Sequence, residues 1–241
     1  MIRTEQGYAQ IFKIYGKSET EVKEKLQDLL KCGGAVVIYT RRRGKDVHVL
    51  AETQAEDEES AKAALKPVAK EIKKALGDMY YSTKENETME ETVVRLLTKY
   101  GLTVTTAESC TGGMIASAIV SVAGASACFK EGYITYSNEA KKKLLGVRED
   151  TLKQYTVVSA QVAQEMAAGA AAAAQSSLAV SVTGVAGPDP DEGNPVGLVY
   201  IGIAFEGSVY AARFQFTGSR EEIRRQAACE ALALALGVVS E

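Results

Sequence analysis

The feature that most constrains the fold is an alternation of strand-like and helix-like segments after residue 87. β-Branched and apolar runs that predict strands alternate with segments of helical periodicity that begin at N-cap residues. Because most strands are connected through helices and the last two form a hairpin across Glu206-Gly207, we expect a three-layer α/β/α domain with a mixed sheet. The predicted order is helix 88–100, strand 102–108, helix 114–122, strand 132–136, helix 138–145, helix 159–174, strand 178–183, strands 198–205 and 208–216, and helix 219–236.

Residues 1–80 have the pattern of a separate, small two-layer α/β domain. Strand 9–15 precedes a helix that begins at the capping box Ser18-x-x-Glu21 and runs to residue 30. A hairpin of strands 35–41 and 45–52 follows, and then a helix over 57–76 with Gly77 as its C-cap. The polar segment 81–87 predicts a linker, so the larger domain is expected to span residues 88–241.

Composition and cysteine usage disfavour several classes of protein. The 241 residues are 46% apolar, yet no apolar run approaches the ~20 residues of a membrane span, and the first residues show no signal-peptide pattern. The cysteines are scattered without a C-x-x-C pair, which disfavours a disulfide scaffold or a zinc site and favours a reducing, cytoplasmic location. They are Cys32, Cys110, Cys128 and Cys229.

The charge balance gives no strong nucleic-acid signal. The formal net charge is −3, and the basic run Arg41-Arg42-Arg43 falls at the expected tip of a hairpin, where a solvated turn is the better interpretation. Residues 1–85 also lack the G-x-x-G loop with which KH domains bind RNA. We therefore expect the small domain to serve packing or oligomerisation, with a homo-oligomer (a dimer being favoured) and neither nucleic acid nor a membrane as its partner.

Ser109 lies where the strand 102–108 is expected to turn into a helix through Gly112 and Gly113. A serine at such a corner has its hydroxyl outside the sheet, beside the free N–H groups of the helix start, which suit developing negative charge. This arrangement suits the nucleophile of an amide- or ester-cleaving enzyme, and the alternative is an ordinary turn with Ser109 as N-cap. Cys110 is a rival nucleophile, but adjacent side chains on such a turn point apart, so only one can face a shared site.

The single histidine limits the choice of a general base. His48 falls in a strand-like alternation in the small domain, which argues against a Ser-His-Asp triad and against a histidine metal site. A lysine or a tyrosine must then activate Ser109.

Lys141 is the lysine that the pattern favours. It lies in the first turn of helix 138–145 and is expected to share a face with Leu144 and Leu145. Burial and the helix dipole would both favour the neutral amine that a general base requires near pH 7. The alternative is a lysine whose stem covers the edge of an apolar face while its ammonium stays in water.

A third cluster follows strand 178–183, which ends in small residues that let the backbone approach a ligand closely. The Gly/Pro/Asp-rich segment 184–197 after it is a candidate lid, although an ordinary surface loop accounts for its composition equally well.

Five motifs occur in order along the chain: Ala107-Glu108-Ser109-Cys110-Thr111-Gly112-Gly113; Tyr136-Ser137-Asn138-Glu139-Ala140-Lys141 with Leu145-Gly146-Val147; Val158-Ser159; Gly184-Val185-Ala186-Gly187-Pro188 with Pro195-Val196-Gly197; and Arg220-x-x-x-Arg224. Together they resemble the C-terminal domain of the competence/damage-inducible protein CinA, a family that includes the nicotinamide-nucleotide amidohydrolase PncC. The resemblance covers residues 88–238, and residues 6–80 resemble the KH-type connector of long CinA proteins. The large molybdopterin-binding-like N-terminal domain of those proteins has no counterpart here, so its pyrophosphatase activity is not carried over.

The resemblance implies deamidation of nicotinamide mononucleotide to nicotinate mononucleotide and ammonia, without a metal or another cofactor. It makes Ser109, Tyr136 and Lys141 catalytic, with Lys141, assisted by Tyr136, accepting the proton of Ser109. A departure from the family pattern at Asp189-Pro190 is expected to stiffen the loop. The alternative hypothesis is a catalytically weak, nucleotide-binding CinA-like protein that acts in competence or the DNA-damage response. The oxyanion and substrate contacts that the resemblance implies are Cys110, Thr111, Gly112, Gly113, Asn138, Thr183, Gly184, Gly187 and Arg220.

Overall fold

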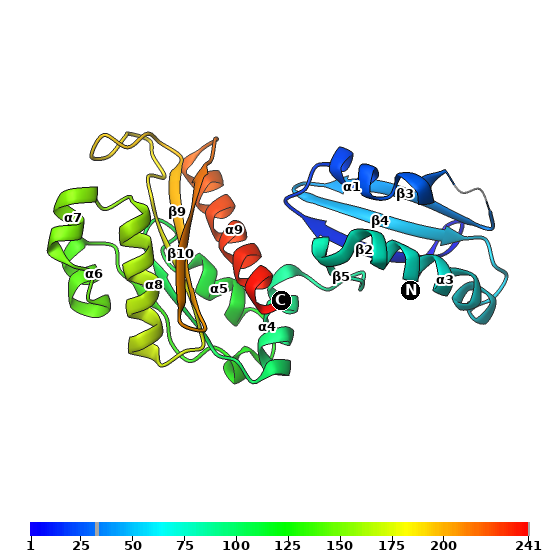
Figure 1. Ribbon diagram of the computed structural model, residues 1–241, viewed down its shortest axis with the longest axis horizontal. Helices are drawn as coiled ribbons and strands as arrows, with labels where there is room; N and C mark the ends of the chain where they lie inside the picture. The colour runs from blue at the N-terminus through cyan, green and yellow to red at the C-terminus, as the bar shows by residue number, and fades with distance from the viewer. Residues whose placement is uncertain (32–33, 241) are drawn as a thin grey trace. The chain divides into compact units, whose positions relative to one another are not determined.

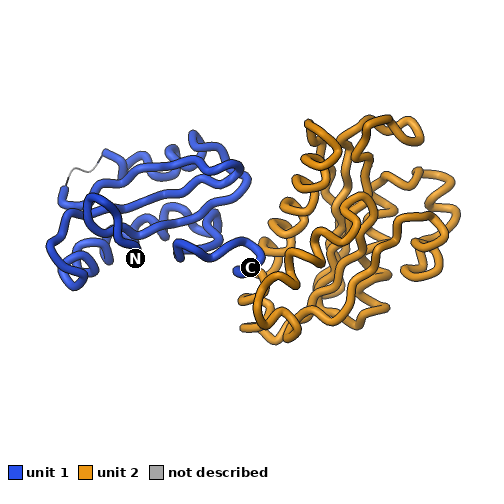
Figure 2. The backbone as a smooth tube through the Cα atoms, turned by 180° about the vertical axis from the view of Figure 1, so that it is seen from behind, with its two compact units in different colours: residues 1–92 blue, residues 93–241 orange. Residues whose placement is uncertain are grey.

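The chain folds into two compact units in a computed structural model that describes residues 1–31 and 34–240. The units comprise residues 1–92 and 93–241, and each is described by itself (Figures 1 and 2). Among the described residues, Cys110, Cys128 and Cys229 form no disulfide bond, and Cys32 lies outside the described residues.

The first unit is an antiparallel sheet with helices on one face. Its strands are β1 (Ile2–Thr4), β2 (Gly7–Tyr15), β3 (Val36–Arg43), β4 (Asp46–Thr53) and β5 (Tyr80–Ser82), in the order β1-β2-β4-β3 with β5 also paired to β2. The helices are α1 (Glu19–Lys25), α2 (Gln27–Leu30) and α3 (Glu58–Leu76), followed by the 3₁₀ turn η1 (Gly77–Met79). The predicted capping box at the start of α1 is confirmed, because Ser18 and Glu21 exchange side-chain to backbone hydrogen bonds.

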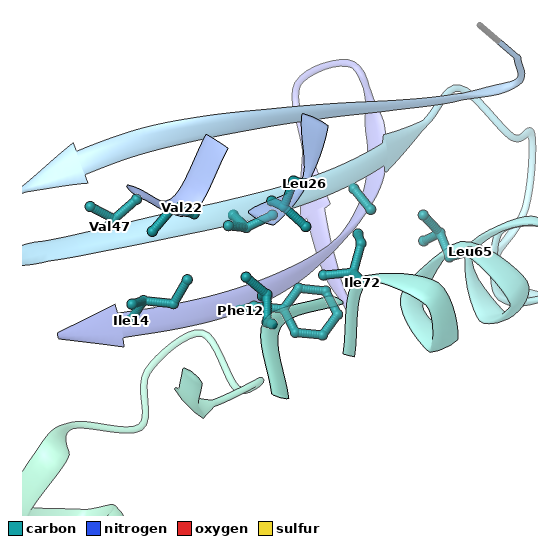
Figure 3. Packing of buried hydrophobic residues seen from close by; sticks show 10 residues of the cluster. Phe12, Ile14, Val22, Leu26, Val47, Leu65 and Ile72 are labelled. Atoms are coloured by element: carbon teal, nitrogen blue, oxygen red, sulfur yellow. The ribbon is translucent and has the colours of Figure 1, made fainter. Parts of the chain in front are cut away.

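Alternation along β2 and β4 builds the core of this unit. Phe12, Ile14 and Val47 point from the sheet toward the helices, where Leu26 and Ile72 meet them; all five are fully buried (Figure 3). Burying side chains of this size contributes about 1.5–3 kcal/mol each. The helix-bearing face of the sheet is therefore what holds the unit together.

The sheet has two strands that the sequence analysis did not predict, β1 and β5. Each has only three residues, which is too short to show a periodic pattern. Residues 81 and 82 belong to β5, so the segment predicted as a linker over 81–87 begins inside the sheet. The run Arg41-Arg42-Arg43 forms the exposed end of β3 rather than the hairpin tip, which is Gly44-Lys45.

The second unit contains the predicted mixed sheet. Its strands are β6 (Val104–Glu108), β7 (Tyr133–Ile134), β8 (Leu178–Gly184), β9 (Leu198–Phe205) and β10 (Ser208–Gln215), in the order β10-β9-β8-β6-β7. β6 is parallel to β7 and β8, whereas β8–β9 and β9–β10 are antiparallel. The helices are α4 (Met89–Tyr100), α5 (Met114–Val120), α6 (Asn138–Leu145), α7 (Glu149–Tyr155), α8 (Ala160–Ala174) and α9 (Arg220–Ser240), with a 3₁₀ turn η2 (Ala125–Ala127).

Helices cover both faces of this sheet, as the three-layer prediction requires. α8 packs on β8, β9 and β10 and carries α6 and α7 on its outer side, whereas α9 packs on β8 and β9 from the other face together with α5 (Figure 1). The chain leaves β6 through α5, on one face, and leaves β7 toward α6 and α8, on the other. The carboxyl ends of β6 and β7 therefore form a topological switch point, the place where open α/β sheets bind ligands.

Candidate active site

Ser109 is the first residue beyond β6 at the switch point. Every residue of β6 is buried, and the Ser109 amide continues the parallel ladder by donating to the carbonyl of Val182 at 3.0 Å. Gly112 and Gly113 follow with φ angles of 60° and 96°, a conformation that turns the chain sharply before α5. The strand thus fixes the backbone of Ser109, and the turn leaves its side chain at the edge of the sheet, 9% exposed.

Lys141 reaches Ser109 from α6. Its Nζ lies 3.1 Å from the Oγ of Ser109 and donates a hydrogen bond to the carbonyl oxygen of Thr135 at 2.8 Å. The side chain is completely buried and, among the described residues, has no carboxylate partner. Burial therefore lowers the pKa of Lys141 from 10.5 to about 8, which gives a substantial neutral fraction near pH 7 to 8.

The helix that carries Lys141, α6, packs closely on α8. α8 is rich in alanine, and a Cβ added at Gly169 would lie only 1.8 Å from the carbonyl oxygen of Leu145 in α6. Ser137 caps α6 by accepting a hydrogen bond from the Ala140 amide, which orients the first turn and Lys141 with it. The prediction that Lys141 shares a buried face is right for Leu145 and wrong for Leu144, which is 44% exposed because the apolar stripe of this short helix is narrow.

The start of α5 is capped by the buried carboxylate of Glu108. Its oxygens accept hydrogen bonds from the amides of Gly113, Ile115 and Ala116. The Gly112 amide donates to the carbonyl of Ser109 at 3.1 Å. The amides of Gly112 and Gly113 thus already have acceptors. Among the described residues, the amides of Cys110 and Thr111 donate to no backbone carbonyl, so these two are the remaining candidates for the oxyanion donors.

Cys110 is a poor rival to Ser109 as a nucleophile. Its side chain is 6% exposed, and burial raises the pKa of the thiol to about 11, so that it stays protonated near neutral pH. Its carbonyl and that of Thr111 each accept a hydrogen bond of 2.9 Å from Arg224 of α9.

Tyr136, to which the family resemblance gives a catalytic role, is hydrogen-bonded to Arg220 rather than to the pair of Ser109 and Lys141. The side chain is 64% exposed, and its hydroxyl accepts a hydrogen bond from Arg220 at 3.2 Å. Within the described residues it bonds neither to Ser109 nor to Lys141. Arg220 also donates to the carbonyl of Gly187, so this arginine connects Tyr136 to the 184–197 segment.

The other predicted contact residues lie around the same edge. Asn138 is the first residue of α6, half-buried, and its amide side chain has no partner among the described residues. Thr183 is buried at the end of β8, where its hydroxyl donates to the carbonyl of Val157 at 2.8 Å. Gly184 has no room for a side chain, because a Cβ would meet Val199 at 2.6 Å. Together these residues surround the carboxyl ends of the parallel strands.

The segment 184–197, predicted as a candidate lid, is attached to residues 156 and 157 by two side-chain hydrogen bonds. Glu192 accepts a hydrogen bond from the Val157 amide at 3.0 Å, and Asn194 donates one to the Thr156 hydroxyl at 3.1 Å. Residues 188–193 are exposed and their turn is closed by backbone hydrogen bonds between Asp191 and Asn194.

Glu108 and Arg224 belong to the site, but neither has a role in the sequence-based hypothesis. The signal for Glu108 is an acidic residue immediately before the nucleophile and six positions before the expected helix start at residue 114, near which a carboxylate is stabilising. The signal for Arg224 is its spacing of four from Arg220, which places both arginines on one face of α9.

The fold and the site define a three-layer α/β protein with a buried serine–lysine pair at the carboxyl edge of its parallel strands. The chain belongs to the CinA family: residues 86–239 match the CinA C-terminal domain, and residues 9–82 match the KH domain of the damage-inducible protein CinA. The predicted family resemblance is thereby confirmed.

Relatives with this family name cover nearly the whole chain. A CinA-like protein of Kosmotoga olearia is 41% identical over 228 residues, which are 93% of this chain and 55% of that protein. A putative competence-damage inducible protein of Caldicellulosiruptor saccharolyticus is 41% identical over 229 residues, 95% of this chain and 56% of that protein. The chain thus spans about half the length of the curated relatives that it matches.

Solved structures of the family match about two thirds of this chain. The crystal structure of a CinA superfamily protein from Klebsiella pneumoniae is 35% identical with a TM-score of 0.62, covering 65% of this chain and 99% of that one. The competence/damage inducible protein from Agrobacterium tumefaciens is 39% identical with a TM-score of 0.61, covering 64% and 95%. In residues 1–31 and 34–240, no helix is both long and apolar enough to span a membrane.

Proposed function

We propose that the chain is a metal-independent amidase that deamidates nicotinamide mononucleotide to nicotinate mononucleotide and ammonia. The observation that carries the proposal is the buried pair of Ser109 and Lys141, 3.1 Å apart, in which burial lowers the pKa of the lysine to about 8. A serine hydroxyl needs an adjacent base to become a nucleophile, and a neutral lysine is one.

The proposed reaction proceeds through an acyl-enzyme. Ser109 Oγ attacks the carboxamide carbon while its proton passes to Nζ of Lys141, and the amides of Cys110 and Thr111 stabilise the oxyanion. Lys141 then returns the proton to the leaving nitrogen, and ammonia departs from a nicotinoyl ester of Ser109. Water attacks this ester with Lys141 again accepting a proton, which releases the carboxylate product and restores the serine.

The choice of a nicotinamide nucleotide rests on the family resemblance and is supported by groups around the pair. The guanidinium of Arg220 is exposed beside the site and supplies the positive charge that a phosphate requires. The exposed ring of Tyr136 offers an aromatic face for the cationic pyridinium, so we assign Tyr136 to substrate binding rather than to proton transfer.

The test is ammonia release by the purified chain from nicotinamide mononucleotide, with nicotinate mononucleotide identified as the second product. Nicotinamide riboside and free nicotinamide serve as substrates that lack the phosphate or the whole nucleotide. We expect turnover that falls steeply once the phosphate is removed and that vanishes in Ser109→Ala. Binding of the nucleotide without ammonia release would instead favour a nucleotide-binding protein with no catalytic role.

A further inference from the structure

Three successive carbonyls, those of Ser109, Cys110 and Thr111, each accept a hydrogen bond that fixes the turn after the nucleophile. The Ser109 carbonyl accepts from the Gly112 amide at 3.1 Å, and the carbonyls of Cys110 and Thr111 each accept from Arg224 at 2.9 Å. Arg224 uses two different nitrogens, Nε for Cys110 and a terminal nitrogen for Thr111. One guanidinium therefore holds the turn through two hydrogen bonds, and it comes from a helix that begins more than a hundred residues later in the chain.

Fixing these carbonyls also fixes the directions of the N–H groups in the same peptides. In a planar trans peptide, the carbonyl and the N–H of the next residue point in opposite directions. Holding the Cys110 carbonyl on Arg224 consequently directs the Thr111 N–H away from the guanidinium. In the same way, the bond between the Ser109 carbonyl and the Gly112 amide fixes the direction of the Cys110 N–H.

We infer that Arg224 is a positioning residue for the oxyanion site. Through the Cys110 carbonyl it orients the Thr111 amide. Through the Thr111 carbonyl it orients the Gly112 amide, whose bond to the Ser109 carbonyl fixes the Cys110 amide. The inference rests on the acyl-transfer chemistry proposed above. Preorganised amides cost no reorganisation as charge develops on the substrate oxygen, which is why such donors contribute strongly to rate. Where the structure is described, Arg224 has no carboxylate partner, so its charge also polarises the peptide whose N–H belongs to Thr111.

Gly112 supports this arrangement. Its φ of 60° is a left-handed conformation, and a Cβ at this position would lie 3.3 Å from the terminal nitrogen of Arg224. A side chain at residue 112 would thus strain the turn and crowd the guanidinium at once.

The test compares Arg224→Met with Arg225→Met. Arg225 is the next residue of α9, but it is exposed and pairs with Glu221 instead of the turn. We expect Arg224→Met to lower kcat for ammonia release by about 10²-fold, the loss typical of a disturbed oxyanion donor, while KM changes by less than about threefold. Arg225→Met should retain wild-type kcat and KM.

A second readout does not depend on the substrate. A fluorophosphonate forms a tetrahedral adduct on an activated serine, and the rate at which it modifies Ser109, followed by mass spectrometry, should fall in Arg224→Met in parallel with kcat. If the wild-type protein reacts with this probe but releases no ammonia from nicotinamide mononucleotide, the proposed substrate is wrong and the role of Arg224 is still tested by the labelling rates.

Unchanged kcat and labelling in a folded Arg224→Met would overturn the inference, as would a loss confined to KM. Thermal unfolding shows whether the variant is folded. If it is not, Arg224→Lys replaces it, because lysine keeps the charge without the planar fork. That variant should lose about tenfold in kcat, and wild-type rates in it would contradict the inference equally.

Discussion

The side-chain nitrogen of Lys141 is held by the carbonyl oxygen of Thr135 at 2.8 Å while it faces Ser109. One N–H of the amine is committed to this carbonyl, which holds the nitrogen beside the serine hydroxyl. In a Ser-His-Asp triad a carboxylate orients the base. Here a neutral carbonyl does so without the negative charge that would keep the lysine protonated.

The nucleophile assignment predicts opposite outcomes for two adjacent residues. Ser109→Ala should lower kcat by at least ~10³-fold with the fold intact, as when a nucleophile of this type is removed. Cys110→Ala should keep most of the activity, because the thiol is buried and the pKa of Cys110 is raised to about 11. Steady-state ammonia release measures both, and an inactive Cys110→Ala beside an active Ser109→Ala would reverse the assignment.

Activity should rise with pH as Lys141 loses its proton. Since the pKa of Lys141 is lowered to about 8, kcat/KM is expected to increase through an apparent pKa near that value and then level off. Lys141→Arg retains the charge but does not deprotonate, so it should be nearly as inactive as Lys141→Ala. A pH–rate profile from pH 6 to 10 checks this, and an active Lys141→Arg would show that Lys141 pairs with the substrate as a cation.

The same lysine should make the wild-type protein less stable at neutral pH. Below about pH 8 the buried amine is protonated, and a pKa that falls from 10.5 in the unfolded chain to about 8 costs about 3 kcal/mol of unfolding free energy. This cost disappears as the pH rises from 8 to 10.5. The stability of Lys141→Met relative to wild type should therefore be greatest at pH 7 and decrease by pH 10 in urea unfolding; a difference independent of pH would contradict the lowered pKa.

Tyr136 distinguishes substrate binding from proton relay. Tyr136→Phe removes only the hydroxyl that Arg220 binds, so we expect less than a tenfold loss in kcat, whereas Tyr136→Ala should raise KM by removing the ring. Comparison of kcat and KM for the two variants provides the measurement. If Tyr136→Phe were as inactive as Lys141→Ala, the phenol would have to act in proton transfer.

Activity should survive prolonged dialysis against EDTA. Within the described residues, no group of three or more His, Cys, Asp or Glu side chains is placed to hold a metal ion, and the proposed proton transfers use Lys141 alone. The rate before and after dialysis is the measurement, and a loss reversed by adding a divalent cation would require a different mechanism.

Local patterns in the sequence predict much of this fold. The boxes Thr88–Glu91 and Ser219–Glu222 form the reciprocal hydrogen bonds expected at helix starts, because a capping box involves only neighbours in the chain. Strand β7 is two residues long instead of the predicted five, and the seven-residue helix α7 has no counterpart in the prediction. Segments this short carry too few residues for a period to emerge, and tertiary contacts decide their conformation.

The pairing of Ser109 and Lys141 could be predicted because each residue occupies a recognisable position, one at a strand end and the other on the inner side of a helix start. The partner of Tyr136 could not, because its hydrogen bond to Arg220 spans 84 positions in the chain. Arg224 likewise meets Cys110 across 114 positions. Contacts at such separations depend on how α9 packs on the sheet, and local sequence patterns do not predict that packing.

The contribution of α9 to the site has a consequence for how the protein is made. Ser109 and Lys141 leave the ribosome well before residues 220–240, yet Arg220 and Arg224 lie on this helix and hold Tyr136 and the turn after Ser109. A nascent chain that has folded β6 to β10 would therefore present a serine and a lysine without the two arginines. Competence for catalysis should appear late in synthesis, when α9 has emerged and docked.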